Sequence, residues 1–434
     1  MKYLFVHQNF PGQFLHIVRH LVRSGKHEVV FISEGNANAI PGVRRVLYRM
    51  PDGAGQDGHP AVREFDRALT RADAVAKAAL NLKNLGFIPD IIIGHHGWGE
   101  LLNLQDVFPQ SPLLGYFEFF YHTDNHDAQF DPEFPMSTEF LPRIRAKNAI
   151  NLQALSDPGW GQTPTRFQWS VYPEWAREKI SILREGVDLD LCKPDPGASR
   201  RTFRLRDITI SPREKVVTYV SRDLEPYRGF HVLMRALPKI LKECPKAHIM
   251  LVGGDGVSYG ARLSHGCWRE KMLEEVGDQL DLSRVHFLGK VPYDDFRALL
   301  QRSDAHVYLT YPFVASWSLR EAMAMGCAIV GSKTAPVEEF IKDEETGLLV
   351  PFLDPDVIAD AVLELLEDSH FAKQLRQNAR AEAEATLCLN TYLNHYDALI
   401  EQVRQGSAWS GEMPAKRGKH VKKRRPEACF RLQA

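Results

Sequence analysis

Two arginines have the residue type and the spacing to hold a phosphate group. Arg222 and Arg228 stand at either end of a polar loop that follows a predicted strand and precedes a predicted helix. Fixed cations in such a loop neutralise negative charge that grows on a departing phosphate, and they do so without a metal ion. Any pair of arginines can also be two solvated surface charges, but the position between a strand and a helix favours contact with phosphate.

A second stretch, residues 316–321, supplies backbone N–H donors and a carboxylate. Its backbone N–H groups precede a run of strong helix formers, so we expect them at an open helix N-terminus, where anions bind. Glu321 follows within about one helical turn and can accept hydrogen bonds from sugar hydroxyls. N-capping by the serines, and a glutamate that simply favours the helix dipole, are the plain alternatives. The residues expected to offer these N–H groups are Ser316, Trp317, Ser318 and Leu319.

The first half of the chain places further polar residues after predicted strands. His95 follows one strand, Glu118 ends the next, and Gly12 lies in the turn after the first strand. Ligands of open α/β sheets bind at the carboxyl ends of the strands, so these residues are candidates for substrate contact. Gly12 can equally be an ordinary turn glycine, and Glu118 a structural ion-pair partner. His95 and His96 suggest a metal, but no further ligand stands at a metal-site spacing, so we predict no metal site.

Hydrophobic patterning predicts the elements that hold these residues. Short apolar β-prone runs alternate with helical runs in both halves of the chain, which is typical of parallel sheets covered by helices on both faces. The predicted strands are residues 3–6, 28–32, 89–94, 112–119, 216–220, 247–252, 285–289, 306–309 and 328–331. The predicted helices are residues 14–21, 61–85, 229–241, 319–324, 354–366, 372–387 and 392–403.

Residues 321–326, EAMAMG, resemble the donor-site signature of the retaining GT-B glycosyltransferases of family four, the group 1 glycosyltransferases. The loop described above is similar to the phosphate loop of that family: Arg222 and Gly229 match its arginine and glycine, and Arg228 replaces its lysine. Arginine keeps the charge but changes the geometry. Val291 lies in a segment that resembles the base-binding segment of the family, and an ordinary loop turn is an equally open interpretation.

Other positions depart from the family pattern. Phe313 stands where the family has its first glutamate, which contacts the donor sugar, and a phenylalanine accepts no hydrogen bond. Glu118 is the predicted compensation, because it aligns with a position at which many members have a sugar-contacting histidine. Residues 185–188 resemble the interdomain motif of the family, with Glu185 in place of the more usual asparagine. Residues 188–190 have the form of a D-x-D metal motif, but they lie in this interdomain segment, so we reject a metal role.

The resemblance implies both a fold and a reaction. The fold would be GT-B, with two Rossmann-like domains whose parallel sheets face each other across a donor and acceptor cleft. The reaction would be retaining transfer of a sugar from a nucleotide sugar to a saccharide or lipid-linked acceptor, in polysaccharide or glycoconjugate assembly, with no metal and no cofactor. The predicted catalytic residues are Glu118, His95, Arg222 and Arg228. The predicted donor-binding residues are Gly12, Arg222, Arg228, Val291, Ser316, Trp317, Ser318, Leu319 and Glu321.

Two other functions remain open at this stage. A nucleotide-sugar epimerase can share a fold with two such domains, although the EAMAMG run and the arginine loop argue against it. A non-catalytic scaffold that binds a nucleotide sugar is the second alternative, and Phe313 motivates it.

The predicted domain boundaries follow from composition and from the resemblance. Residues 1–190 form the acceptor-binding domain and residues 213–387 the donor domain. Between them, residues 191–212 are rich in turn formers and are predicted to be a linker. Residues 388–405 are expected to form a helix that returns to the first domain, and residues 406–434 a basic, disordered tail.

Composition limits the partners and the compartment. A formal net charge of −1 gives no general attraction to nucleic acid. We expect a cytoplasmic protein, because the N-terminal residues lack a signal-peptide pattern, no apolar run is long enough to span a bilayer, and the six cysteines are scattered. The basic tail could contact anionic lipid at the inner face of the membrane, or it could serve solubility alone.

Overall fold

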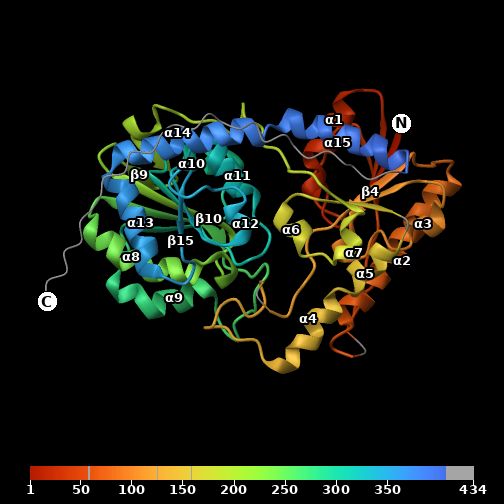
Figure 1. Cartoon of the computed structure of the whole chain (residues 1–434), viewed down its shortest axis with the longest axis horizontal. Helices are drawn as coiled ribbons and strands as arrows, with labels where there is room; N and C mark the ends of the chain where they lie inside the picture. Colours follow the sequence, from red (N-terminus) through yellow and green to blue (C-terminus); the bar gives the residue numbers. More distant parts are fainter. Residues whose placement is uncertain (57–58, 125, 158, 407–434) are drawn as a thin grey trace.

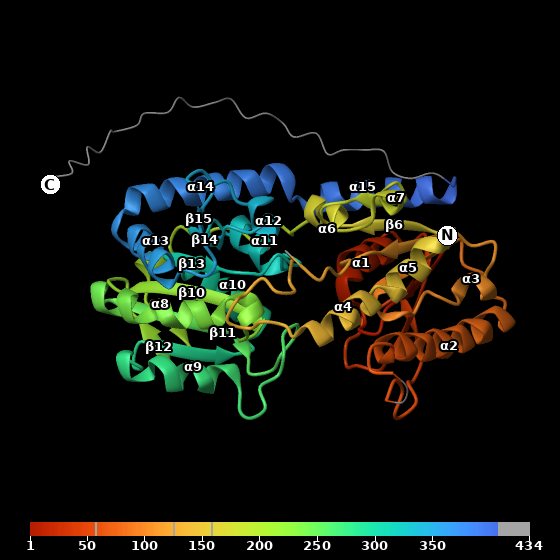
Figure 2. The same cartoon turned by 60° about the horizontal axis from the view of Figure 1, so that its bottom comes forward.

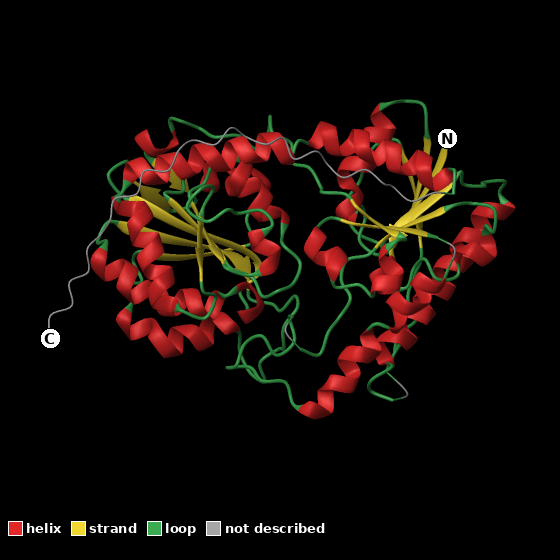
Figure 3. Ribbon diagram, viewed as in Figure 1, coloured by secondary structure: helices red, strands yellow, loops and turns green. Residues whose placement is uncertain are grey.

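The computed structural model describes residues 1–56, 59–124, 126–157 and 159–406. The chain forms two lobes, and each lobe is a parallel β-sheet with helices on both faces (Figure 1, Figure 3). The predicted α/β architecture with two Rossmann-like units is therefore confirmed. Nearly all of the predicted basic tail lies outside the described residues.

The first lobe is built on a seven-stranded sheet in which all neighbouring strands are parallel. Successive side chains of a strand point to opposite faces. Tyr3 and Phe5 therefore join the core on one face, and Leu4 and Val6 the core on the other. In spatial order the strands are β3 (Val43–Leu47), β2 (Glu28–Ser33), β1 (Lys2–Val6), β4 (Ile91–His95), β5 (Leu113–Tyr116), β6 (Trp160–Thr163) and β7 (Ile180–Ile182).

Helices cover both faces of this sheet. α1 (Leu15–Arg23) buries its apolar stripe against one face, and α2 (Arg63–Asn84) buries its stripe against the other. The other helices of the lobe are α3 (Leu104–Val107), α4 (Leu141–Lys147), α5 (Ala149–Ser156), α6 (Arg166–Ser170) and α7 (Glu174–Arg177), with 3-10 turns η1 (Gly12–Phe14), η2 (His96–Trp98) and η3 (Thr138–Phe140).

The second lobe repeats the plan with a six-stranded parallel sheet. In its central strand, Val217 and Tyr219 face one core, whereas Val216 faces another on the opposite side. In spatial order the strands are β12 (Val285–Gly289), β11 (Ala247–Gly254), β10 (Lys215–Asp223), β13 (Ala305–Tyr308), β14 (Ile329–Ser332) and β15 (Leu348–Val350). Its helices are α8 (Phe230–Glu243), α9 (Trp268–Val276), α10 (Tyr293–Arg302), α11 (Trp317–Ala324), α12 (Ala335–Glu338), α13 (Pro355–Glu367) and α14 (Ser369–Thr386), with 3-10 turns η5 (Pro226–Arg228) and η6 (Gly277–Gln279).

The last helix returns to the first lobe. α15 (Leu389–Arg404) follows α14 along one side of the molecule and lies over the first lobe (Figure 2). Its side chains Tyr396, Leu399 and Ile400 are buried in the same core as α1. The C-terminal part of the chain therefore helps to close the core of the N-terminal lobe.

Some elements had no clear pattern in the sequence. β3 lies at the edge of its sheet and carries Arg44 and Arg45, so it lacks an apolar run. α9 and α10 each mix several charged residues with a few buried apolar ones. In the predicted linker, the structure has a turn η4 (Ala198–Arg200) and a small antiparallel hairpin of β8 (Phe203–Leu205) and β9 (Ile208–Ile210). Leu205 and Ile210 of this hairpin are buried against the second lobe.

A segment of the first lobe, residues 127–134, reaches across to the second lobe, and we call it the strap. Phe130 packs on Tyr311, with 5.0 Å between ring centres. Asp131 Oδ2 accepts hydrogen bonds from the Tyr311 hydroxyl (2.8 Å) and from His231 Nε2 (3.0 Å). Burial opposes ionisation of Asp131, but these two hydrogen bonds hold its pKa below the usual value. The strap thus ties the two lobes together through both apolar and charged contacts.

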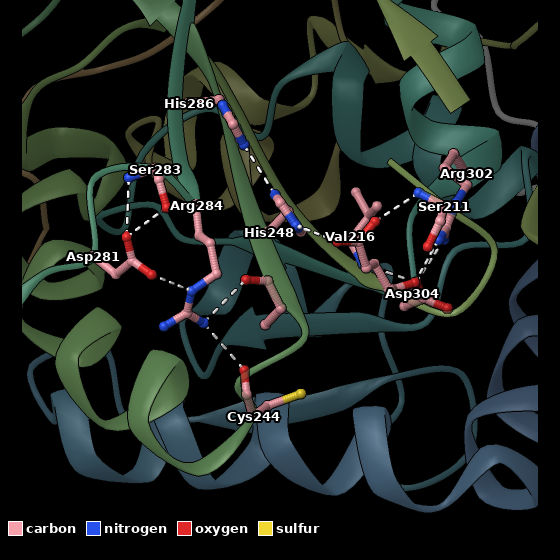
Figure 4. Close-up of polar contacts among 12 residues, drawn as sticks. Ser211, Val216, Cys244, His248, Asp281, Ser283, Arg284, His286, Arg302 and Asp304 are labelled. Atoms are coloured by element: carbon pink, nitrogen blue, oxygen red, sulfur yellow. Dashed lines mark hydrogen bonds and ion pairs between the residues drawn. The ribbon is translucent and has the colours of Figure 1, made fainter. Parts of the chain in front are cut away.

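Polar side chains, the buried Arg302 among them, fix the starts of strands in the second sheet (Figure 4). Arg302 and Asp304 form an ion pair at 2.6 Å, and Asp304 also accepts a hydrogen bond from the Val216 amide at 2.8 Å. His248 and His286 share a hydrogen bond of 3.1 Å between β11 and β12. These contacts lie at the amino ends of the strands. They therefore stabilise the edge of the sheet opposite to the carboxyl ends, where such sheets bind ligands.

Candidate active site

The carboxyl ends of strands in both sheets meet at a cavity of about 920 Å³ between the lobes. Residues that follow β1, β4 and β5 line it from the first lobe, and residues that follow β10 and β13 line it from the second. This is the place where open α/β sheets bind their ligands. The predicted site residues that line the cavity are Gly12, His95, Glu118, Arg222, Arg228, Ser316, Trp317, Ser318 and Glu321.

Two predicted donor-binding residues do not line the cavity. Leu319 is buried in the core, and its amide donates to the Ser316 carbonyl at 3.3 Å, so the expectation that this amide is open to a ligand is wrong. Val291 packs among apolar side chains of the second lobe, and Tyr293 and Phe296 from α10 line the cavity in its place. An apolar residue after a strand suits a core as well as a ligand site, so its type alone does not decide.

The N-terminus of α11 faces this cavity. The Ser316 amide donates to the Tyr308 hydroxyl at 2.7 Å, so it too is already occupied. The amides of Trp317 and Ser318 have no acceptor within the described parts of the chain. Amides left free at a helix N-terminus, together with the helix dipole, attract an anion. The structure therefore offers a phosphate two amides rather than four.

The two arginines of the predicted phosphate loop both border the cavity, but in different settings. Arg222 is exposed at the end of β10. Arg228 is buried, and its Nη1 donates to Thr310 Oγ1 (2.7 Å) and to the Val314 carbonyl (2.9 Å). Its guanidinium also lies 5.0 Å from the ring centre of Tyr259. Arg228 is thus a fixed cation that shapes the loop before α11, and Arg222 is a cation open to a ligand.

Glu118 faces the cavity from a loop, because β5 ends at Tyr116, earlier than predicted. Its Oε2 lies 3.7 Å from His95 Nε2. Nδ1 of His95 accepts from the Gly97 amide at 2.9 Å, so the ring proton is on Nε2, towards Glu118. Burial opposes ionisation of Glu118, yet the contact with His95 holds its pKa below the usual value. Glu118 is therefore a carboxylate that lies beside the neutral His95 ring and faces the cavity.

Replacing Glu118 with glutamine tests whether this carboxylate serves the reaction. The amide keeps the shape but removes the charge, so kcat/KM for the sugar donor that the resemblance implies should fall by about one to two orders of magnitude, with little change in stability. Steady-state kinetics and a melting curve measure the two effects. Glu384→Gln, at an exposed ion pair on α14, is the matched control. Wild-type kcat/KM in Glu118→Gln would show that Glu118 does not compensate for Phe313.

Phe313 forms an apolar wall of the cavity where the family pattern has a carboxylate. It is buried, and its ring centre lies 4.7 Å from that of Phe119 in the other lobe and 5.1 Å from that of Tyr259. Edge-to-face contacts of this kind stabilise aromatic clusters. Phe313 therefore contributes to the junction of the lobes, and the cavity surface at this point is apolar.

Side chains of α11 also form hydrogen bonds with the first lobe. Glu185, in the loop after β7, accepts on Oε2 from Trp317 Nε1 (2.8 Å) and from Arg320 Nη1 (2.5 Å). Its Oε1 accepts from the Tyr116 hydroxyl at 3.4 Å. The Trp317 indole therefore joins the lobes, while the amide of the same residue remains open to the cavity.

His7 is a cavity residue that the sequence analysis did not select. It follows β1 as His95 ends β4, so its position after a strand was the available signal. Burial, and then the neighbouring His95, lower the pKa of His7 to about 3, so the ring is neutral near pH 7. Gly12 has a φ of +54°, and a Cβ there would lie 3.0 Å from the His7 ring. This backbone conformation and the close His7 ring together favour glycine at this turn.

Glu225 is a second cavity residue that the sequence analysis did not select. Its carboxylate accepts hydrogen bonds from the amides of Ser258 (3.2 Å), Tyr259 (3.2 Å) and Gly260 (2.9 Å). It therefore shapes the loop that brings the Tyr259 ring to Arg228. No sequence pattern indicates this role, because the partners of Glu225 are backbone groups of a distant loop.

One group of side chains outside the cavity has ligand atoms close enough to hold a cation. Asp131 and Glu133 of the strap and His231 of α8 place such atoms within 4.8 Å of one another. Glu133, however, already forms two hydrogen bonds with the Arg235 guanidinium, at 2.6 and 2.8 Å. An arginine of the chain thus supplies positive charge at this cluster.

Models of two glycosyltransferase families match consecutive parts of the chain. The glycosyl transferase family 4 group matches residues 25–192, and glycosyl transferases group 1 matches residues 201–382. The chain belongs to the group 1 glycosyltransferases. The group 1 match spans Arg222, Arg228 and α11, so the family membership predicted from the EAMAMG run and the arginine loop is confirmed.

Curated relatives of this group 1 family member are glycosyltransferases by name. The D-inositol 3-phosphate glycosyltransferase of Corynebacterium efficiens is 28% identical over 203 residues, which cover 46% of each chain. The phosphatidyl-myo-inositol mannosyltransferase of Mycolicibacterium smegmatis is 35% identical over 178 residues, or 40% of each chain. The chain thus matches about half of the length of these relatives or less.

Solved structures share the fold of this group 1 family member over nearly its whole length. Sucrose-phosphate synthase from Thermosynechococcus elongatus has a TM-score of 0.72 and 18% identity, covering 94% of this chain and 100% of that one. Anabaena HepE in complex with UDP-glucose has a TM-score of 0.65 and 18% identity, covering 92% and 99%. These likenesses confirm the predicted GT-B fold. Among the described helices, none is long and apolar enough to cross a membrane.

Proposed function

We propose that this protein transfers a sugar from a nucleotide-activated donor to an acceptor with retention of configuration, in the assembly of a polysaccharide or glycoconjugate. The observation that carries the proposal is the convergence of Arg222, Arg228 and the N-terminus of α11 on one cavity. Two cations and two free amides together form an anion-binding site suited to a diphosphate. Membership of the group 1 family supports the same reaction.

In the proposed mechanism the second lobe holds the leaving group. As the bond between sugar and phosphate breaks, negative charge grows on the diphosphate, and Arg222, Arg228 and the α11 amides stabilise it. Arg228 and the α11 amides are fixed before the reaction starts, and with Arg222 they supply the charge without a metal ion. Glu321 accepts hydrogen bonds from the ribose hydroxyls of the donor, and contact between the lobes keeps water from the reacting sugar.

The first lobe would bind the acceptor next to the sugar. Glu118 and His95 face the cavity from this lobe, so an acceptor hydroxyl would approach the same face of the sugar that the diphosphate leaves. The names of the relatives indicate inositol phosphate and phosphatidylinositol acceptors, which supports a saccharide or a lipid-linked acceptor here. The proposed contact between the basic tail and an anionic membrane rests on the sequence alone.

A thermal-shift screen of nucleoside diphosphates and nucleotide sugars tests the proposal. A ligand that binds only the folded protein raises the melting temperature according to its saturation. UDP and UDP-glucose come first, because the related fold of Anabaena HepE holds them. We expect a selective shift that persists in EDTA, is lost in Arg222→Ala, and is kept in Arg204→Ala, an exposed arginine on β8. No shift with any nucleotide would contradict the transferase proposal and favour a scaffold.

A further inference from the structure

Glu321, the proposed ribose acceptor, is already held on one side by a tyrosine. It lies beyond the first turn of α11, and its Oε1 accepts a hydrogen bond of 2.5 Å from the Tyr293 hydroxyl at the start of α10. Its Oε2 accepts no hydrogen bond from the described part of the protein. Both residues line the cavity. One carboxylate oxygen is thus fixed and the other is open.

The direction of this contact follows from a third residue. Cys192 Sγ lies 3.2 Å from the Tyr293 hydroxyl, in the segment that connects the lobes. A phenol has a single proton, and an ionised carboxylate can only accept, so Tyr293 donates to Glu321 and the thiol donates to Tyr293. Burial raises the pKa of the Cys192 thiol to about 11, so the thiol keeps its proton near pH 7. The three groups form one directed chain of hydrogen bonds that ends on Glu321.

We propose that Tyr293 is a positioning residue for the donor, because its hydroxyl fixes the Glu321 carboxylate so that Oε2 receives the ribose. This inference rests on the proposed function and deepens it. The ring of Tyr293 stacks on Phe296, at 5.7 Å and 27°, so α10 holds the phenol in place before a donor arrives. A carboxylate that is already oriented loses less rotamer freedom on binding.

The same contact favours the ionised form of Glu321. Burial raises the pKa of Glu321 above its usual value, and the Tyr293 hydrogen bond and then the charge of Arg320 on α11 limit that rise. Cys192 from the connecting segment reaches the carboxylate only through Tyr293, and Arg297 of α10 lies 5.8 Å from the Tyr293 ring. The ionised form accepts from the Tyr293 hydroxyl on Oε1 and from a ribose hydroxyl on Oε2 at the same time, and its charge strengthens both hydrogen bonds. Donor binding is therefore lost as pH falls through the pKa of Glu321, and removing the Tyr293 hydroxyl moves that loss to higher pH.

Calorimetric titration of Tyr293→Phe with UDP and with 2′-deoxy-UDP between about pH 4 and pH 8 tests the proposal. If the nucleotide screen selects another base, the matching pair of diphosphates replaces them. Near pH 7 the variant should bind UDP about fivefold more weakly, because the expected loss of binding free energy is about that of one hydrogen bond. It should also discriminate less between UDP and 2′-deoxy-UDP. The acid-side loss of binding should begin at a higher pH than in the wild type. In a Glu321→Gln background, Tyr293→Phe should have no further effect.

Tyr396→Phe on α15 is the matched control, because it removes a phenol that accepts from Gln162 outside the cavity. The same affinity, discrimination and pH profile in Tyr293→Phe as in the wild type would overturn the inference, provided that Glu321→Gln weakens UDP binding. If Glu321→Gln binds UDP as the wild type does, Glu321 is not a ribose acceptor and the inference falls with it. Absence of any nucleotide binding by the wild type would overturn the proposed function itself.

Discussion

Replacing Arg228 with alanine should lower kcat by about two to three orders of magnitude, as expected when a fixed group that stabilises transition-state charge is removed. The guanidinium is buried at the edge of the cavity, and no solvent cation of comparable order can take its place. The variant also loses the hydrogen bonds to Thr310 and to the Val314 carbonyl, so the loop before α11 becomes less ordered. Steady-state release of nucleoside diphosphate from the donor measures the effect.

Two control variants separate charge from folding. Arg228→Lys keeps the cation found at this position in the family pattern but cannot form the same fork of hydrogen bonds, so it should retain about a tenth of the activity or more. Arg284→Ala removes a partly buried arginine, outside the cavity lining, that binds Asp281 (Figure 4) and the Leu241 carbonyl. It should lower stability and leave kcat of the folded enzyme unchanged. An Arg228→Ala enzyme with kcat within about threefold of wild type would rule out this role.

Replacing Arg320 with methionine should destabilise the folded protein by about 3–5 kcal/mol. Arg320 is 3% exposed and Glu185 is 5% exposed, so the substitution leaves a carboxylate buried without its cation. The Trp317 indole and the Tyr116 hydroxyl remain as donors to Glu185, but neither carries a charge. The midpoint of urea unfolding, followed by tryptophan fluorescence, measures the loss.

The double variant Glu185→Gln/Arg320→Met provides the decisive comparison. With both charges removed, no ion is left buried, so most of the lost stability should return. Arg404→Met, at an exposed ion pair with Glu401 on α15, should change stability by less than about 1 kcal/mol. Equal losses in the Arg320 and Arg404 variants would show that the buried pair does not hold α11 to the first lobe.

Local patterns in the sequence were sufficient to predict the fold class and the general place of the site. Strand-length apolar runs such as residues 91–93 and 249–252, separated by helical stretches, indicate parallel sheets, and the structure has them. The positions of His95 and Glu118 in the first half of the chain and of Arg222 in the second placed each at the carboxyl edge of its own sheet, and all three line the cavity. These predictions succeeded because they depend on periodicity and chain order, which neighbouring residues determine.

The edge strand β3 and the helices α9 and α10 escaped prediction for the opposite reason. Their polar exposed faces outweigh the few apolar side chains that hold them, so only packing against the rest of the lobe identifies them. Likewise, Val291 and Leu319 have residue types that suit a core as well as a binding loop. Their burial was decided by neighbours distant in the sequence.

By itself, the sequence determined that this protein is a two-lobed α/β protein with a cation-rich loop and a helix N-terminus suited to a diphosphate. Only the tertiary structure decided which groups remain free to bind. In the folded protein the amides of Ser316 and Leu319 already donate to acceptors of the chain. Glu185 pairs with Arg320 across the lobes, and the Tyr293 hydroxyl donates to Glu321. These pairings join segments that are far apart in the chain or elements whose packing is set by the whole lobe. Local periodicity fixes the face on which a side chain lies, but not the partner that it meets there.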